Sequence, residues 1–258
     1  MSLSPSVIRS PPGVGEVIIP SFFITPGVVM MNFSKESSVM ANTNAPFGFR
    51  QIKGTGSAPT YEQNTRYIKS DNSTAIYFGD AVIPLTTGYI AQATASTVRV
   101  EGIFAGCKYV STSQKRTVWS NYWPGSDTSN DVEAYVITDP NARFIVQTAN
   151  SNTTATAVGQ AQVGENIGFN WNDSTATGET NGNTANGLST MFADQYTLSS
   201  AGVTGANAAL PFRIIALANY LPGQANPLSG INGNDATSGY NEIVVAFNNA
   251  MPRNFAGM

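Results

Sequence analysis

The chain of 258 residues contains no histidine and a single cysteine, Cys107. Without histidine, Ser-His-Asp and Cys-His nucleophiles and histidine-based zinc sites are excluded. One cysteine cannot form a disulfide within the chain, so the cysteine content does not indicate an oxidising compartment. Cys107 lies in the apolar run GIFAGCKYV, and we expect it to be a small buried side chain rather than a reactive thiol.

Charge is also scarce, since only 11% of the residues are charged and the net charge is −3. The lysines and arginines are scattered and form no basic stripe with interleaved aromatic residues, which argues against nucleic-acid binding. Asparagine, threonine, serine and glycine are plentiful instead, as is typical of β-structure with many turns. Because isolated soluble proteins use charge to stay apart, the composition favours a surface that is largely covered by partners.

The N-terminal segment, residues 1–45, is strongly apolar but is interrupted by Glu16, Pro20 and Pro26. These interruptions argue against both a signal peptide and a membrane-spanning helix. We therefore expect an extended arm, which must pack on the body of the protein or on another subunit to leave water. The candidate contact residues of this arm are Ile18, Ile19, Phe22, Phe23, Ile24, Val28, Val29 and Met30.

Residues 46–258 are expected to form one all-β body, a small β-barrel or sandwich with long polar loops. Short apolar runs bounded by turn residues recur at regular spacing from residue 66 to 149, and this spacing predicts a compact β-unit over 46–149. Residues 150–258 are expected to be richer in loops and to end in two closing strands that pair with the first unit. The predicted closing strands are LPFRIIALANYL and NEIVVAFNNAM.

Alternating side chains indicate which face of each strand is buried. Val132, Ala134 and Val136 share one face of a predicted strand, and Phe144 and Val146 share a face of the next. In TVRVEGIF, the alternation places Val98, Val100 and Gly102 inside, with Arg99 and Glu101 in water.

Turns and loops carry their own signals. Gly79-Asp80 is predicted to be a tight turn in which glycine takes a positive φ and aspartate caps nearby N–H groups. DPNAR, residues 139–143, is predicted to be a type I turn. Residues 148–189 are expected to be mostly loop around one strand, ENIGFNW, and a short helix is predicted over 188–196.

The run WSNYWPGS, residues 119–126, places Trp119, Tyr122 and Trp123 just before a Pro-Gly turn. Such clustered aromatics could plug the core, contact another subunit or stack against a ligand. In an extended strand, Trp119 and Trp123 would lie on the same face, about 13 Å apart at roughly 3.3 Å per residue. That separation favours a structural plug or a subunit contact over a platform for one sugar ring.

No catalytic, cofactor or metal site is predicted. Carboxylates are present, but no spacing singles out a pair that could serve a glycosidase, and a hydrolase remains the least favoured hypothesis. The oxygen-rich runs NDSTATGET and NGNDATSG do not match the spacing of a calcium-binding loop.

The order of motifs between Phe47 and Gln147 resembles virion structural proteins of tailed, podovirus-like phages, in particular capsid decoration (cement) proteins. The motifs are FGFR, YIKSDNSTAIYFGDAVIP, GYIAQATASTVRVEGIFAGCKYV, WSNYWPGS and AYVITDPNARFIVQ. The resemblance implies a non-enzymatic protein on the capsid surface of the virion, which binds the major capsid protein and itself as a homotrimer or dimer. It implies neither nucleic-acid nor membrane binding, and it would make the apolar arm a capsid contact.

The alternative is a carbohydrate-binding adhesin, or a protein of the head fibre or tail-fibre base of a virion, with a host glycan as ligand. Flat, exposed aromatic rings are what sugar stacking requires. The candidate residues for this function are Trp119, Tyr122, Trp123, Tyr89, Tyr109 and Trp171.

Overall fold

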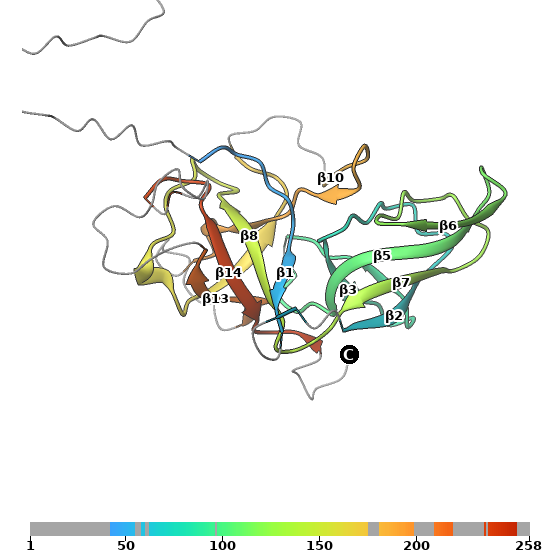
Figure 1. The fold of residues 1–258 in the computed structure, drawn as a ribbon, viewed down its shortest axis with the longest axis horizontal. Helices are drawn as coiled ribbons and strands as arrows, with labels where there is room; N and C mark the ends of the chain where they lie inside the picture. Colours follow the sequence, from blue (N-terminus) through green and yellow to red (C-terminus); the bar gives the residue numbers. More distant parts are fainter. Residues whose placement is uncertain are drawn as a thin grey trace, which may run out of the picture. The chain divides into compact units, whose positions relative to one another are not determined.

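The computed structural model describes residues 42–54, 58–59, 62–95, 97–174, 181–198, 209–218, 235 and 237–251. All of them belong to one compact unit, residues 39–258. Within the described ranges the chain is mostly β and contains no α-helix, and Gln160–Gln162 and Gln195–Thr197 form short 3-10 turns. The predicted all-β class is therefore confirmed, with two six-stranded sheets in a sandwich-like arrangement (Figure 1).

The first sheet has the strand order β1-β8-β12-β9-β13-β14, and β14 also pairs with β8. The pairings of β8, β12, β9, β13 and β14 therefore form a closed ring, as in a small barrel. Most pairs are antiparallel, but β12 runs parallel to β8. The strands are β1 (Arg50–Lys53), β8 (Arg143–Ala149), β9 (Asn166–Asn170), β12 (Phe192–Asp194), β13 (Phe212–Leu217) and β14 (Glu242–Phe247).

The second sheet has the order β2-β7-β5-β3-β4, and β6 pairs with β5 next to β3. All of its pairings are antiparallel. The long strand β5 is central, because it pairs with β3, β6 and β7 (Figure 1). The strands are β2 (Gln63–Ile68), β3 (Ala81–Pro84), β4 (Ile90–Gln92), β5 (Gly102–Ser111), β6 (Arg116–Ser120) and β7 (Val132–Ile137).

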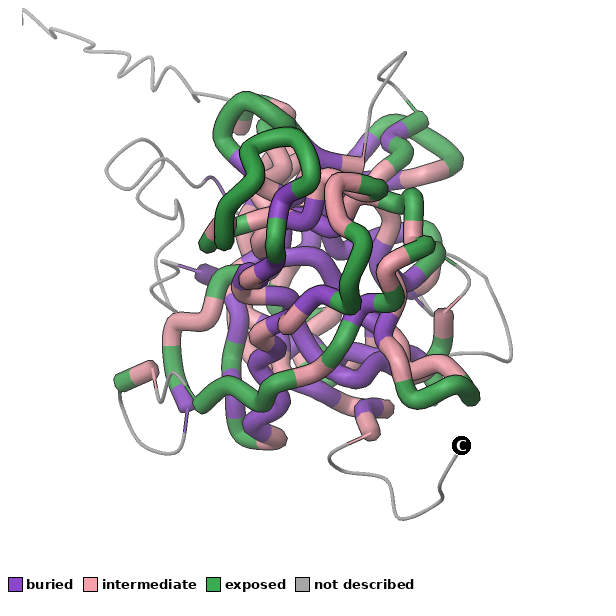
Figure 2. The backbone as a smooth tube through the Cα atoms, turned by 90° about the vertical axis from the view of Figure 1, so that its right-hand side faces the viewer, coloured by how far each residue is buried: buried purple, intermediate pink, exposed green. Residues whose placement is uncertain are grey.

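A larger hydrophobic core is formed mainly by side chains of the first sheet and is dominated by phenylalanine rings. Phe49 stacks on Phe212 with 4.4 Å between ring centroids, and Phe144 meets Phe247 edge-on at 5.1 Å. Phe169 completes the group at the edge of Phe49. Such aromatic contacts add to the free energy gained by burying apolar area. Figure 2 shows buried positions toward the interior and exposed ones along the connecting loops.

A smaller core lies on the inner face of the second sheet. The predicted inward set Val132, Ala134 and Val136 is confirmed, since all three side chains are fully buried. The remaining members come from six separate segments of the chain. They are Ile68, Ile76, Val82, Ile90, Phe104, Cys107, Tyr109 and Trp123.

The predicted alternation before β5 is only partly correct. Val100 and Gly102 are buried as expected, but Val98 is 46% exposed and Glu101 is 5% exposed. Regular strand geometry begins only at Gly102, so the period of two does not extend back to Val98. Glu101 tolerates burial because its carboxylate pairs with Arg66.

The turn at Gly79-Asp80 joins the two sheets. Gly79 has a positive φ of +93°, as predicted, and its carbonyl accepts from the amide of Phe49, the residue before β1 of the first sheet. The Gly79 N–H donates to the Phe104 carbonyl, and the Phe104 N–H donates to the Asp80 carbonyl. A Cβ atom at Gly79 would lie 3.1 Å from the Phe49 nitrogen, so glycine is needed both for the backbone angle and for the close approach.

One other prediction is confirmed, and another is confirmed in part. At DPNAR, the Ala142 amide donates to the Asp139 carbonyl and the Asn141 amide to the Asp139 side chain, which closes the turn. The prediction that both closing strands pair with the first unit holds for one of them: β14 forms a ladder with β8, whereas β13 pairs with β14 and β9.

The helix predicted over residues 188–196 is wrong. Leu188–Ser189 forms β11, which pairs with β10 (Gly182–Asn183), and β12 and a 3-10 turn follow. Phe192 and Ala193 are fully buried, so strand pairing and tertiary packing override the local preference. The stretch 148–189 consequently has more regular structure than the single predicted strand.

Candidate functional site

The aromatic run WSNYWPGS is split between the surface and the core. Strand β6 ends at Ser120, where the Ser120 hydroxyl accepts from the Tyr122 amide at 3.1 Å and the chain bends. Trp119 is 68% exposed, whereas Trp123 is fully buried. The expectation that both indoles would lie on one face of an extended strand is therefore wrong, because the strand stops between them.

Trp123 closes the smaller core. Its backbone pairs with Ile76 through two hydrogen bonds of 2.8 and 2.9 Å, which fixes the position of the side chain. The indole packs edge-on against Tyr109 at 5.1 Å, and its Nε1–H donates to the Asn72 carbonyl at 3.3 Å. The only polar atom of the buried indole therefore has a hydrogen-bond partner. Tyr122 is half-buried and stacks in parallel on Tyr77 at 5.6 Å.

Trp119 belongs to a group of side chains on the opposite, solvent-facing side of the second sheet. The strand registers place Tyr67 opposite Glu133, Glu133 opposite Lys108, and Lys108 opposite Trp119. Tyr135 lies two residues from Glu133 on β7 and so points to the same side. We call these five residues (Tyr67, Lys108, Trp119, Glu133 and Tyr135) the outer face.

Two rings of the outer face lie parallel above β5. Trp119 on β6 and Tyr135 on β7 are separated by β5, so their backbones are about 10 Å apart at roughly 4.8 Å per strand. Their ring centroids are only 6.1 Å apart with an interplanar angle of 4°. Both rings must therefore lean over β5. Gly106, which pairs with Tyr135 and has φ +134°, carries no side chain that would obstruct them.

Polar contacts hold these rings in place. The Lys108 ammonium lies 5.0 Å from the centroid of the Trp119 ring and 3.0 Å from Glu133 Oε2. The Tyr135 hydroxyl donates to Glu133 Oε1 at 3.1 Å. The hydrogen bond with Glu133 raises the pKa of Lys108, and the same bond lowers the pKa of Glu133. Because the pair is solvent-exposed, its main effect is to orient the side chains rather than to stabilise the fold.

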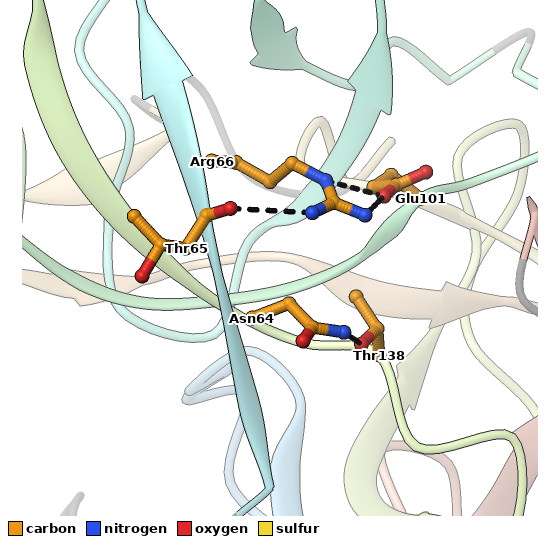
Figure 3. A network of polar contacts seen from close by, with 5 residues as sticks. All are labelled: Asn64, Thr65, Arg66, Glu101 and Thr138. Carbon is orange, nitrogen blue, oxygen red and sulfur yellow. Dashed lines mark hydrogen bonds and ion pairs between the residues drawn. The ribbon is translucent and has the colours of Figure 1, made fainter.

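A second polar group lies at the start of the second sheet (Figure 3). The Arg66 guanidinium donates from Nε and Nη2 to Glu101 Oε1 at 2.7 and 2.6 Å, and from Nη1 to the Thr65 carbonyl at 3.2 Å. Asn64 donates to the Thr138 hydroxyl alongside. Glu101, which the alternation had placed in water, is thus buried with its charge compensated.

This group borders an open cleft of about 440 Å³ whose lining includes the carboxylates of Glu62, Glu101 and Asp139. Glu101 is engaged by Arg66, and one oxygen of Asp139 accepts from the Asn141 amide at 2.8 Å. Both carboxylates therefore take part in contacts that hold the structure together. Across the described part of the chain, no group of three histidine, cysteine, aspartate or glutamate side chains could hold a metal ion.

Cys107 is buried, as predicted, and burial raises the pKa of its thiol to about 12. Its Sγ donates to the Tyr122 carbonyl at 3.4 Å. A thiol with such a pKa remains protonated at neutral pH and is a poor nucleophile.

The other sequence-predicted residues are scattered. The candidate contact residues between Ile18 and Met30 lie outside the described residues. Of the candidates for sugar stacking, Tyr109 is buried, Trp171 packs against the larger core, and the Tyr89 hydroxyl donates to Asp131 at 2.8 Å. Only Trp119 among them belongs to the outer face.

Sequence reasoning missed four members of the outer face: Tyr67, Lys108, Glu133 and Tyr135. The alternation that places Val132, Ala134 and Val136 inside also places Glu133 and Tyr135 outside, so part of the signal was present. The order of the strands, which brings β2, β7, β5 and β6 side by side, could not be inferred from the sequence.

Comparison with known proteins gives no relative: no family model, curated protein or solved structure matches this chain. Among the described residues, none forms a helix of the length and apolar character needed to cross a membrane.

Proposed function

We propose that this chain is a non-enzymatic virion structural protein that binds the outside of a phage capsid and decorates or cements it. The observation that carries the proposal is where the phage-like motifs lie in the fold. The motifs between Phe47 and Gln147 contribute to β1 through β8, including the Gly79-Asp80 junction and the DPNAR turn. They therefore constitute the framework of the body rather than an incidental surface loop.

The polar side chains of the body also support a structural role. Glu101 is engaged by Arg66, and the Cys107 thiol is buried with a pKa of about 12. Asp80 is fully buried, so a substrate cannot reach it. An enzyme needs an accessible acid, base or nucleophile, whereas an assembly protein needs only interfaces. The engaged or buried state of these three side chains is therefore consistent with a structural role.

The proposed partners are the major capsid protein and further copies of this chain, as a homotrimer or dimer on the virion surface. The apolar residues between Ile18 and Met30 are the proposed contact, because a sequence this apolar gains free energy when a partner covers it. The scarcity of charge, at 11% of residues, fits a surface that neighbouring subunits cover.

Replacing Phe22 and Phe23 with serine in the full-length chain should weaken binding to capsids of the source phage that lack this protein. Loss of two aromatic anchors removes buried apolar area and should reduce affinity at least about a hundredfold. Co-sedimentation of purified protein with these capsids measures the effect. Trp119→Ala is the matched control, since it also removes an exposed aromatic ring but should leave capsid binding unchanged.

Undiminished capsid binding by the Phe22→Ser, Phe23→Ser double variant would contradict the proposed contact. Failure of the unaltered protein to co-sediment with capsids at all would contradict the proposed function itself. A thermal unfolding curve of the double variant, compared with that of the unaltered protein, establishes that the body still folds.

A further inference from the structure

The outer face presents an unusual concentration of exposed apolar surface. Five large hydrophobic side chains are prominently exposed among the described residues, and three of them lie on this side of the second sheet. Tyr67 is 53% exposed, Trp119 is 68% exposed, and Val110, two residues from Lys108 on β5, is 47% exposed. Exposed apolar side chains that gather on one face of a sheet in this way indicate an interaction site.

We infer that the outer face is a binding site for a neutral saccharide, with a pyranose ring stacked on Trp119 and Tyr135. This inference goes beyond the proposed capsid role and does not depend on it. A pyranose ring has C–H groups on its faces and hydroxyl groups around its edge. It therefore matches a surface that combines parallel aromatic rings with hydrogen-bonding groups beside them.

The rings are arranged for stacking before any ligand binds. The Lys108 ammonium lies over Trp119, and the exposure of the indole leaves much of its surface open. Tyr135 is fixed by its hydroxyl, which donates to Glu133. Because these contacts already restrict the side chains, binding loses less conformational entropy than it would with mobile rings.

The polar groups beside the rings can serve sugar hydroxyls. Lys108 has three ammonium hydrogens and uses one for Glu133, so it retains donors for a ligand. Glu133 accepts from Lys108 and Tyr135, and its carboxylate has further lone pairs for a hydroxyl donor. Hydrogen bonds to ionised groups are stronger than neutral ones, which suits recognition of an uncharged, hydroxyl-rich molecule.

The charge of the outer face decides against two other ligand classes. One lysine and one glutamate compensate each other, so nothing attracts the phosphates of a nucleic acid. The cores of protein–protein interfaces are depleted of charged residues, whereas here the Lys108–Glu133 ion pair lies between the rings of Tyr67 and Trp119. A neutral saccharide fits both the apolar rings and the central ion pair.

Titration of the full-length protein with neutral hexasaccharides of glucose, mannose and N-acetylglucosamine tests this inference. Calorimetry together with tryptophan fluorescence should show saturable, weak binding of at least one of them. Trp119→Ala should weaken that binding about tenfold, since removing one aromatic stacking contact has an effect of this size. Tyr135→Ala should also weaken it.

Tyr196→Ala is the matched control, because Tyr196 is a 43% exposed aromatic residue in the 3-10 turn Gln195–Thr197, outside the second sheet. It should bind saccharide as the unaltered protein does. The inference is overturned if none of the three hexasaccharides binds, or if Trp119→Ala binds as tightly as the unaltered protein. The outer face would be a protein interface instead if the unaltered protein binds no saccharide and Trp119→Ala loses capsid binding or self-association.

Discussion

Replacing Trp123 with alanine is expected to destabilise the protein by about 3–5 kcal/mol, the usual cost of truncating a large aromatic residue in a core. The indole is fully buried, packs edge-on against Tyr109, and donates to the Asn72 carbonyl. Its removal leaves a cavity and takes one of two donors from the Asn72 carbonyl, which also accepts from the Ser126 amide at 3.4 Å. Because small domains have a total stability of about 5–15 kcal/mol, a loss of this size is a large fraction of the whole.

Urea unfolding of Trp123→Ala and of Trp119→Ala measures this difference. Trp119→Ala loses only exposed contacts with Tyr135 and Lys108, so its effect should be about 1 kcal/mol or less. Equal destabilisation by the two substitutions would contradict the division of the aromatic run into a buried and an exposed part. The comparison is well matched, since both variants change tryptophan to alanine within five residues of sequence.

The stability of the protein is expected to fall as the pH rises from about 4 to about 7, because of Asp80. Burial raises the pKa of this carboxyl to about 7, well above the roughly 3.9 of an unfolded aspartate. A group whose pKa is raised by folding stabilises the protein fully below its unfolded pKa, and the contribution is lost as the pH passes the folded pKa. Three pKa units correspond to on the order of 4 kcal/mol.

The geometry explains why the neutral form is favoured. Asp80 Oδ2 accepts from the Tyr77 amide at 2.8 Å and from Gln92 Nε2 at 2.7 Å. Oδ1 has no hydrogen-bond partner of normal geometry, although the nearby Ser189 hydroxyl opposes part of the rise in pKa. A buried carboxylate with one unpaired oxygen is costly to ionise, and protonation removes that cost.

Asp80→Asn tests this directly, since asparagine keeps an acceptor for Tyr77 and Gln92 but cannot ionise. We expect the variant to be more stable than the unaltered protein at pH 8 and to lose most of the decline between pH 4 and 7. The chain contains no histidine, so no imidazole titrates in the same range. Chemical unfolding at a series of pH values provides the measurement.

Asp131→Asn is the control for this titration. Asp131 is exposed, and its hydrogen bond from Tyr89 lowers its pKa, so its contribution is present above about pH 4 and is lost only at lower pH. That variant should therefore keep the decline between pH 4 and 7. Identical pH profiles for Asp80→Asn and the unaltered protein would show that Asp80 does not titrate near neutrality.

The strands of both sheets were largely predictable from the sequence, because they carry strong local patterns. Alternation identified the inward side of β7, and the Gly79-Asp80 and DPNAR turns followed from residue types with known backbone preferences. These signals depend only on neighbours in sequence, which is why they were reliable.

What could not be predicted depends on contacts between distant residues. Pairing of the closing strands with the first unit was expected, but the sequence did not show that β14 would meet β8, about 100 residues away, and close the ring of strands. The parallel pairing of β12 with β8 has no local signal, and the helix predicted over residues 188–196 includes β12 itself. Glu101 was placed in water because its partner, Arg66, lies 35 positions away.

The same limit applied to the outer face. Trp119 and Trp123 look equivalent in sequence, and only the bend after Ser120 gives them opposite environments. The five side chains of the outer face come from four strands, so their proximity follows from the order β2-β7-β5-β6 and not from any motif. A single aromatic run thus contributes both a closing residue of the smaller core and the most exposed ring of the candidate site.

Acrylamide quenching of tryptophan fluorescence tests this central division most directly. The protein has three tryptophans, of which Trp119 is 68% exposed, Trp123 is fully buried and Trp171 is half-buried. Trp119→Phe should remove the largest part of the strongly quenched emission, and Trp123→Phe should leave that part in place. Quenching that is unchanged in Trp119→Phe and reduced in Trp123→Phe would contradict both the buried role of Trp123 and the exposed outer face.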